Sequence, residues 1–338
     1  MAQKELDLLC IGNALVDVFA RADEQTLARH GITRPVQHVE YEIINKILSE
    51  LGSKDLVLSS GGGAANVAKI AGFLGAELCF TGSVGEVKEP DTFGRLFIKE
   101  LSNAGVKLRL SLKPSPTGVC LYVRTGDETR IAASPSAALE LTENDIVEED
   151  LQKASVVVID GFILNRSGMV RRILDLADKY GTVIALDLSS ISIASEYAAE
   201  ISEYARRHSL ILFMNEAEAE AFYKETRKDN SLFPEMCEFF ESLTAGKRFP
   251  IIVVKLGARG ALCFAEGKTQ RFETQALVPA DSTGAGDAFC AAFLSAWVWD
   301  KALPECAVFG NKAAGIVLGA TGTKVEKEAF GNLVQLLK

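Results

Sequence analysis

The order of apolar and polar positions along the 338 residues predicts a layered α/β fold. Short apolar runs alternate with segments in which apolar residues recur every three or four positions. We interpret the apolar runs as buried parallel strands, namely Leu6 to Ile11, Glu77 to Thr81, Val156 to Asp160, Val183 to Leu188, Leu210 to Met214 and Ile251 to Lys255. We interpret the periodic segments as helices, namely Ala64 to Leu74, Thr92 to Ala104, Ser167 to Tyr180, Ala198 to Arg207 and Glu216 to Tyr223. Such alternation is typical of a mostly parallel sheet covered by helices.

Two stretches interrupt this pattern, because residues 13–40 and 111–132 lack good helical periodicity. In the second stretch, Thr117 to Val123 and Thr129 to Ala133 are expected to form a hairpin. Strands that cannot join the parallel sheet must pack elsewhere, so we expect a small β lid over the strand ends. No Pro- or Ser-rich linker separates independent halves, and we expect residues 1–338 to form one domain with the lid built from these two segments.

The net charge of −9 changes the range of partners to consider. It argues against nucleic acid and against an anionic membrane surface, since both need a concentrated positive field. Any anion must therefore be held locally, as backbone N–H groups at a helix start can do. The apolar stretches are interrupted before membrane-spanning length, so no transmembrane helix is expected.

The seven cysteines are scattered and include no C-x-x-C pair. They read as core thiols of a protein in a reducing compartment. The first residues lack the basic-then-apolar layout of a secretion signal, so the expected location is the cytoplasm.

The sharpest local feature is the segment Asp281-Ser-Thr-Gly-Ala-Gly-Asp287, which directly precedes an apolar, helix-forming stretch. Gly284 and Gly286 allow a tight turn with converging N–H groups, and a helix start adds about half a unit of positive charge. Such a turn can hold a phosphoryl group while Asp287 accepts the proton of a hydroxyl. Taken alone, a Gly-x-Gly-Asp before a helix is more often a plain helix cap than a catalytic site.

Two other phosphate-binding motifs are excluded by single positions. Gly267-Lys-Thr resembles the end of a P-loop, but Leu262 stands where the first glycine is required, and a hairpin turn is expected instead. A dinucleotide-binding G-x-G-x-x-G is also missing, because Asn66 and Phe289 occupy the third glycine position of the two possible starts.

The Asp281–Asp287 segment resembles the C-terminal signature of the ribokinase (PfkB) carbohydrate kinase family, usually written D-T-x-G-A-G-D, with Ser282 in place of the usual Thr. Other family landmarks follow in the right order over nearly the whole chain. The resemblance implies an α/β, ribokinase-like three-layer fold with a central, mostly parallel sheet and a small β lid. It also implies ATP-dependent phosphorylation of a hydroxyl, with Asp287 as catalytic base and Gly284, Ala285 and Gly286 as anion hole.

Two landmarks concern the acceptor substrate. Gly12-Asn-Ala-Leu-Val-Asp17 resembles the family's Asn-x-x-x-Asp region, which implies that Asn13 and Asp17 bind the substrate. Asp17 would accept hydrogen bonds from the hydroxyls of the substrate. Gly61-Gly-Gly-Ala-Ala-Asn66 resembles a motif in which Gly61 and Gly62 contact substrate and act as a lid hinge while Asn66 hydrogen-bonds substrate. From the residues alone, both could be ordinary turns after a strand.

Asn215-Glu-Ala-Glu218 matches the family's N-x-x-E motif. This match implies that Asn215 binds the cofactor near its phosphates and that Glu218 orders a water bound to Mg²⁺, which retains its waters and needs few direct protein ligands. The same residues are also a good helix start, with Asn215 as cap.

Further landmarks concern the nucleotide and a second ion. Lys255, Gly257 and Gly260 lie in a segment that resembles the strand and turn beside ATP, and Asn311 resembles the residue lining the adenine site. Family members often use a monovalent cation beside the anion hole, so K⁺ is a candidate ligand, with Asp281 as a candidate contact.

The start motif, the lid segments Pro116–Cys120 and Gly126–Arg130, and the N-x-x-E motif look most like those of adenosine kinases. This likeness predicts a nucleoside as acceptor, with ribose, fructose or a ketogluconate as alternatives. A catalytically silent relative is a second class, against which the intact turn and Asp287 argue. A nicotinamide dehydrogenase is a third class and lacks its glycine motif. Family lids pair between subunits or close alone, so both a monomer and a homodimer are considered.

Overall fold

A nine-stranded sheet forms the centre of the protein in the computed structural model, which describes residues 4–52, 56–86, 88–126, 128–227, 233–275, 283–319 and 325–337. The strands are ordered β14 (Lys268–Phe272), β13 (Ala261–Ala265), β12 (Ile251–Lys255), β11 (Leu210–Asn215), β10 (Val183–Asp187), β9 (Ala154–Asp160), β1 (Leu6–Ile11), β5 (Leu78–Gly85) and β6 (Lys107–Lys113). The seven strands from β12 to β6 are parallel to one another, whereas β13 is antiparallel to both β12 and β14.

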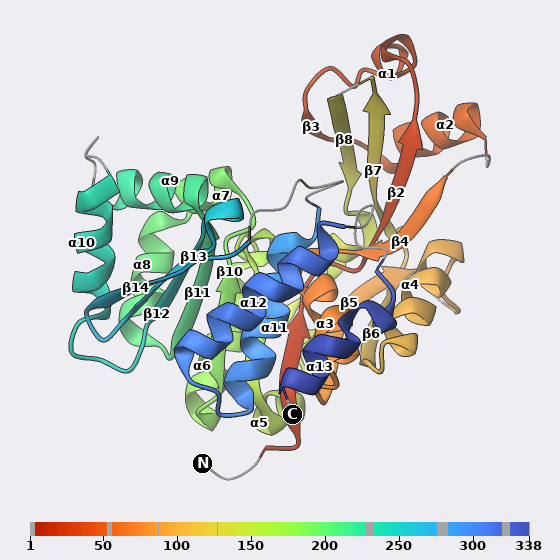
Figure 1. Ribbon diagram of the computed structural model, residues 1–338. Helices are drawn as coiled ribbons and strands as arrows, with labels where there is room; N and C mark the ends of the chain where they lie inside the picture. The colour runs from red at the N-terminus through yellow and green to blue at the C-terminus, as the bar shows by residue number, and fades with distance from the viewer. Residues whose placement is uncertain are drawn as a thin grey trace.

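Helices cover both faces of this sheet (Figure 1). One core contains side chains of α3 (Gly63–Leu74), α4 (Thr92–Asn103), α11 (Ala285–Val298), α12 (Leu303–Val317) and α13 (Gly331–Leu337). The other contains side chains of α5 (Glu148–Lys153), α6 (Ser167–Tyr180), α7 (Ile191–Glu196), α8 (Ala198–Arg207), α9 (Glu216–Arg227) and α10 (Phe233–Thr244). The expected three-layer α/β fold is confirmed.

Strand β1 shows why the apolar runs are continuous. Leu8 and Cys10 point into one core, whereas Leu9 and Ile11 point into the other. Because a parallel strand between two helix layers is buried on both faces, it needs apolar residues at successive positions.

All six predicted strands and all five predicted helices are present, with ends shifted by a few residues at most.

A second sheet of five strands projects beyond the large one (Figure 1). Its order is β3 (Val36–His38), β8 (Glu128–Ser134), β7 (Gly118–Thr125), β2 (Leu15–Arg21) and β4 (Val57–Gly61). The helices α1 (Glu24–Arg29) and α2 (Tyr41–Leu51) accompany it. The predicted hairpin is confirmed as β7 and β8, in which Thr125 pairs with Glu128.

The small sheet differs in extent from the two predicted segments. It also takes β4, and residues 107–113 form β6 of the large sheet, so the second segment contributes to the small sheet only from Gly118. The turn expected at Gly267 is confirmed between β13 and β14, where Glu266 and Gly267 have φ values of 53° and 73°. Two successive positive φ angles are typical of a two-residue hairpin turn.

A buried polar network connects the small sheet to the helical layer. Lys69 of α3 is 4 % exposed and donates 3.1 Å hydrogen bonds to the hydroxyls of Ser59 and Ser60 on β4. Glu100 of α4 accepts hydrogen bonds from the backbone N–H and the hydroxyl of Ser60. Burial lowers the pKa of Lys69, although Glu100 opposes this shift.

In the described parts of the chain, no helix is long and apolar enough to cross a membrane.

Candidate active site

Polar side chains gather where neighbouring parallel strands of the large sheet end. Asp160 ends β9 and lies beside Asp187, which ends β10, in the strand register. Asn215 ends β11 and lies beside Lys255, which ends β12. Because the carboxyl ends of parallel strands meet at one edge, this edge is a typical ligand-binding position in an open α/β sheet.

The glycine turn reaches this same edge at the start of α11. Gly284 is the residue before the helix and has a left-handed φ of 79°, which favours glycine. Ala285, Gly286 and Asp287 form the first turn, whose backbone N–H groups have no partner within the helix. The helix therefore presents an anion-binding end. Asp281 and Ser282 lie outside the described residues, so the predicted cation contact at Asp281 stays a prediction.

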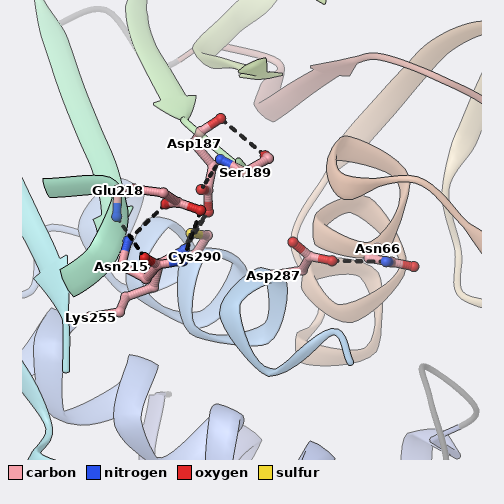
Figure 2. A network of polar contacts seen from close by, with 8 residues as sticks. All are labelled: Asn66, Asp187, Ser189, Asn215, Glu218, Lys255, Asp287 and Cys290. Carbon is pink, nitrogen blue, oxygen red and sulfur yellow. Dashed lines mark hydrogen bonds and ion pairs between the residues drawn. The ribbon is translucent and has the colours of Figure 1, made fainter. Parts of the chain in front are cut away.

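Asp287 is held by Asn66, the polar residue predicted from the Gly61–Asn66 motif. The Asn66 amide donates a 2.8 Å hydrogen bond to Oδ2 of Asp287, which joins α3 to α11 (Figure 2). Burial and then the neighbouring charge of Asp187 raise the pKa of Asp287 to about 7, although the hydrogen bond from Asn66 opposes this shift. A carboxylate with such a pKa changes its protonation state near neutral pH, as a general base does.

Asp160 is a second buried carboxylate at this edge. It is 2 % exposed and accepts hydrogen bonds from the backbone N–H of Ala64, at 3.2 Å, and of Phe162, at 3.1 Å. Burial raises the pKa of Asp160 to about 6. A Cβ atom at Gly12 would lie 3.0 Å from Oδ2 of Asp160, so glycine allows this close approach.

Lys255 and Asp187 form a buried ion pair next to the glycine turn (Figure 2). The Lys255 ammonium lies 2.5 Å from Oδ2 of Asp187, which also accepts a hydrogen bond from the thiol of Cys290 at 3.1 Å. Burial lowers the pKa of Lys255, but Asp187 and neighbouring groups outweigh it and hold that pKa above its usual value. Lys255 is therefore protonated at neutral pH.

The predicted acceptor residues meet where β2 and β4 of the small sheet approach α3. Asp17 on β2 is 3 % exposed, and a Cβ atom at Gly61 would lie 2.3 Å from its Oδ1. A Cβ atom at Gly62, whose φ is 102°, would lie 2.2 Å from the carbonyl oxygen of Asn13. These glycines thus allow the close packing of Asn13 and Asp17. The side chain of Asn13 accepts a 2.7 Å hydrogen bond from Arg166.

Asn215 and Glu218 form a reciprocal cap at the start of α9. Glu218 accepts hydrogen bonds from the backbone N–H and the side-chain amide of Asn215, each at 2.8 Å, and donates its own N–H to Asn215 Oδ1 at 2.9 Å. The plain capping role is therefore present. Burial and the charge of Asp187 raise the pKa of Glu218. Among the described residues, each Glu218 oxygen accepts one hydrogen bond, and a carboxylate oxygen can accept a second.

Asn311 lies apart from this group, on α12. Its amide donates a 3.2 Å hydrogen bond to the carbonyl oxygen of Phe272, and its side chain lines an open cavity of about 570 Å³. Val308, Lys312, Ile316, Asn332 and Leu336 also line this cavity. Gly257 and Gly260 lie in the turn after β12, where a Cβ atom at Gly260 would clash with the carbonyl oxygen of Phe272.

The sequence analysis did not single out four residues at this edge. Asp187 and Cys290 contact Lys255, Arg166 contacts Asn13, and Asp160 accepts a hydrogen bond from Ala64 of the Gly61–Asn66 motif. A signal existed for the two acids, because each follows directly on a buried apolar run at the end where α/β proteins bind ligands.

The structure resembles known kinases over its whole length. A solved adenosine kinase from Sinorhizobium meliloti superposes with a TM-score of 0.84 at 26 % identity and covers 98 % of this chain and 99 % of its own. Adenosine kinase 1 of Arabidopsis thaliana is 28 % identical over 98 % of this chain and 100 % of its own length. A 5-dehydro-2-deoxygluconokinase from Clostridium beijerinckii is 25 % identical over 86 % of this chain and 91 % of its own length. The profile of the pfkB family carbohydrate kinases matches residues 8–329, and the chain therefore belongs to this kinase family.

Proposed function

We propose that the protein transfers the γ-phosphoryl group of ATP to the primary hydroxyl of an adenosine-like nucleoside. The observation that carries this proposal is the position of Asp287, a carboxylate with a pKa of about 7 in the first turn of a helix, where backbone N–H groups have no partner within the helix. Asp287 accepts the proton of the attacking hydroxyl as its oxygen bonds to phosphorus and the bond to the ADP leaving group breaks. The N–H groups of residues 284–286 stabilise the charge on the transferring group.

The acceptor is proposed to lie between the small sheet and the start of α3. Asp17 accepts hydrogen bonds from its hydroxyls, while Asn13, Gly61 and Gly62 shape the site. Asn66 has an acceptor atom available for the substrate, because its Oδ1 is buried and has no hydrogen bond within the described ranges. An acceptor hydroxyl can donate to that oxygen, so that Asn66 contacts both the acceptor and the base.

The nucleotide is proposed to extend from the turn at Gly284 to the cavity beside Asn311. Apolar Val308 and Ile316 together with the Asn311 amide suit an adenine ring. Lys255, Gly257 and Gly260 would lie beside the phosphates. Mg²⁺, when bound, neutralises phosphate charge, and the buried Glu218 fits it because its oxygens can still accept hydrogen bonds from metal-bound waters.

We further propose that the five-stranded sheet acts as a lid of this single-domain protein. The glycines at 61 and 62 join β4 of this sheet to α3, so that a change of backbone angles there would move the sheet over the acceptor. The seven free cysteines support a reducing, cytoplasmic location.

The preference for a nucleoside rests on the adenosine kinases among its relatives, as well as on the motifs of the start and lid segments. A sugar kinase is the second candidate, favoured by the match to a 5-dehydro-2-deoxygluconokinase. Both candidates use the same base and the same anion-binding turn. They differ in the acceptor alone.

An ADP-release assay over a panel of acceptors tests this function. The panel contains adenosine, other nucleosides, ribose, fructose and a ketogluconate, and phosphorus NMR identifies the product. We expect the highest kcat/KM with adenosine or a close analogue and a phosphate on its primary hydroxyl. Preference for a sugar would replace the nucleoside proposal, and no stimulation by any acceptor would contradict the kinase assignment of this site.

A further inference from the structure

The ammonium group of Lys255 lies directly against the backbone of the anion-binding turn. A Cβ atom at Gly286 would be 3.2 Å from Nζ and 3.9 Å from Cε of Lys255. Any side chain at position 286 would therefore crowd the ammonium, whereas glycine leaves it open to the turn. Lys255 reaches this place from the end of β12, and its side chain is only 14 % exposed.

The hydrogen bonds of Lys255 leave donor capacity for a ligand. Nζ donates to Oδ2 of Asp187 at 2.5 Å and lies 3.8 Å from the sulfur of Cys290. The described residues offer it no further hydrogen-bond partner, and an ammonium has three donors. One N–H group thus stays available beside Gly286.

The charges around the turn show why a cation matters there. Asp160, Asp187, Glu218 and Asp287 all lie at this edge, and they repel an incoming phosphate. The Lys255 ammonium lies close to the turn at Gly286, and its pKa is held above the usual value, so that it keeps its charge. In a site shielded from water such a charge acts more strongly than at a surface.

Resting on the proposed function, we propose that Lys255 is a catalytic residue, the fixed cation of the anion hole, which stabilises the transferring phosphoryl group. It forms no covalent bond and keeps its proton throughout. Because the cation is built into the chain, turnover needs no monovalent cation from solution. This proposal gives Lys255 the place beside the anion hole for which the family resemblance made K⁺ a candidate.

A simpler role for Lys255 is to neutralise the buried Asp187. The two roles separate in a double variant, because Lys255→Met alone leaves a buried carboxylate without its partner. Asp187→Asn/Lys255→Met removes both charges and leaves none unpaired. Lys113→Met is the matched control, since Lys113 forms a similar half-buried pair with Asp145 at 3.0 Å, away from the turn.

The measurement is kcat and KM for ATP in the wild type and the variants, with salts of potassium, sodium and tetramethylammonium. We expect kcat to fall by about 100-fold or more in both Lys255→Met and the double variant, as for the loss of an oxyanion-hole donor. Lys113→Met should keep kcat within about tenfold, since it leaves the Lys255 ammonium in place, and the fall in the double variant should exceed the fall in Asp187→Asn alone. Wild-type turnover should be the same in all three salts.

Two results would overturn this role of Lys255 without touching the proposed function. One is recovery of wild-type kcat in the double variant, which would show that Lys255 only neutralises Asp187. The other is a wild-type requirement for potassium. Acceptor-dependent ADP release by the wild type is measured first, and its absence would overturn the proposed function together with the role of Lys255.

Discussion

The side-chain amide of Asn66 donates a 2.8 Å hydrogen bond to the carboxylate of Asp287, 221 residues further along the chain. Asn66 lies in the first turns of α3 and Asp287 in the first turn of α11, so the bond joins the two helix starts that meet at the carboxyl edge of the sheet. It holds the carboxylate in place and favours its charged form. The position and the proton affinity of the proposed base thus depend on a residue of the acceptor motif.

The first prediction concerns pH. Since the pKa of Asp287 is raised to about 7, kcat/KM should fall about tenfold per pH unit below that value, as the base becomes protonated. Asn66→Ala removes a hydrogen bond that lowers this pKa, so the acid limb should move to higher pH. The exposed Asn45→Ala is the control and should leave the profile unchanged. If the pH profile of Asn66→Ala did not move, the hydrogen bond from Asn66 would not control the pKa of Asp287.

The second prediction concerns stability. A raised carboxyl pKa means that the folded protein binds a proton that the unfolded chain has lost, so the contribution of Asp287 is present at low pH and is lost as pH rises from about 4 to about 7. Asp287→Asn lacks this dependence. We expect the free energy of unfolding of the variant, relative to that of the wild type, to rise by roughly 3 kcal/mol from pH 5 to pH 8. Urea unfolding at the two pH values measures this difference. If the variant and the wild type differed in free energy of unfolding by the same amount at both pH values, Asp287 would have an ordinary pKa.

The third prediction concerns Gly61. A Cβ atom there would lie 2.3 Å from the carboxylate of Asp17, so Gly61→Ala must displace Asp17. We expect the acceptor KM to rise about tenfold or more while ATP binding is retained, because a carboxylate hydrogen bond to the acceptor is lost. Gly331→Ala is the control, since its added methyl group meets open space. An unchanged acceptor KM in Gly61→Ala would remove Asp17 from the acceptor site.

The fourth prediction concerns Glu218. Glu218→Gln keeps the size of the side chain and a hydrogen bond to Asn215 but removes the charge that would order metal-bound water. We expect at least a tenfold higher Mg²⁺ concentration for half-maximal rate. Glu305→Gln is the matched control, because Glu305 makes the same kind of cap with the N–H of Ala302 at the start of α12. Equal effects in both variants would mean that Glu218 is a cap and nothing more.

The elements that could be predicted from sequence are those with a local signature. A glycine turn directly before an apolar helix identified Gly284 to Asp287, and continuous apolar runs identified six of the seven inner strands of the large sheet. Strand β6 was missed even though Leu108, Leu110 and Leu112 alternate with polar residues, as an edge strand requires. Strand β4 was missed because Val57–Gly61 has only two large apolar residues.

The place of Asp160 and Asp187 after an apolar run is a sequence signal, but their roles could not be assigned from it. Each is a single acid after an apolar run, and its role arises from the strand register that places the two side by side. The approach of Lys255 to Gly286 likewise depends on how α11 packs on β12. Long-range packing of this kind leaves no local pattern in a single sequence.

The most direct test of the account is Asp287→Asn. Acceptor-dependent ADP formation and equilibrium binding of ATP are measured in parallel on the wild type and the variant. We expect turnover to fall by at least about 1000-fold while ATP affinity stays within a few-fold, because the variant loses the proton acceptor but keeps the anion-binding turn. Turnover close to that of the wild type would show that Asp287 is not the base and would contradict the mechanism.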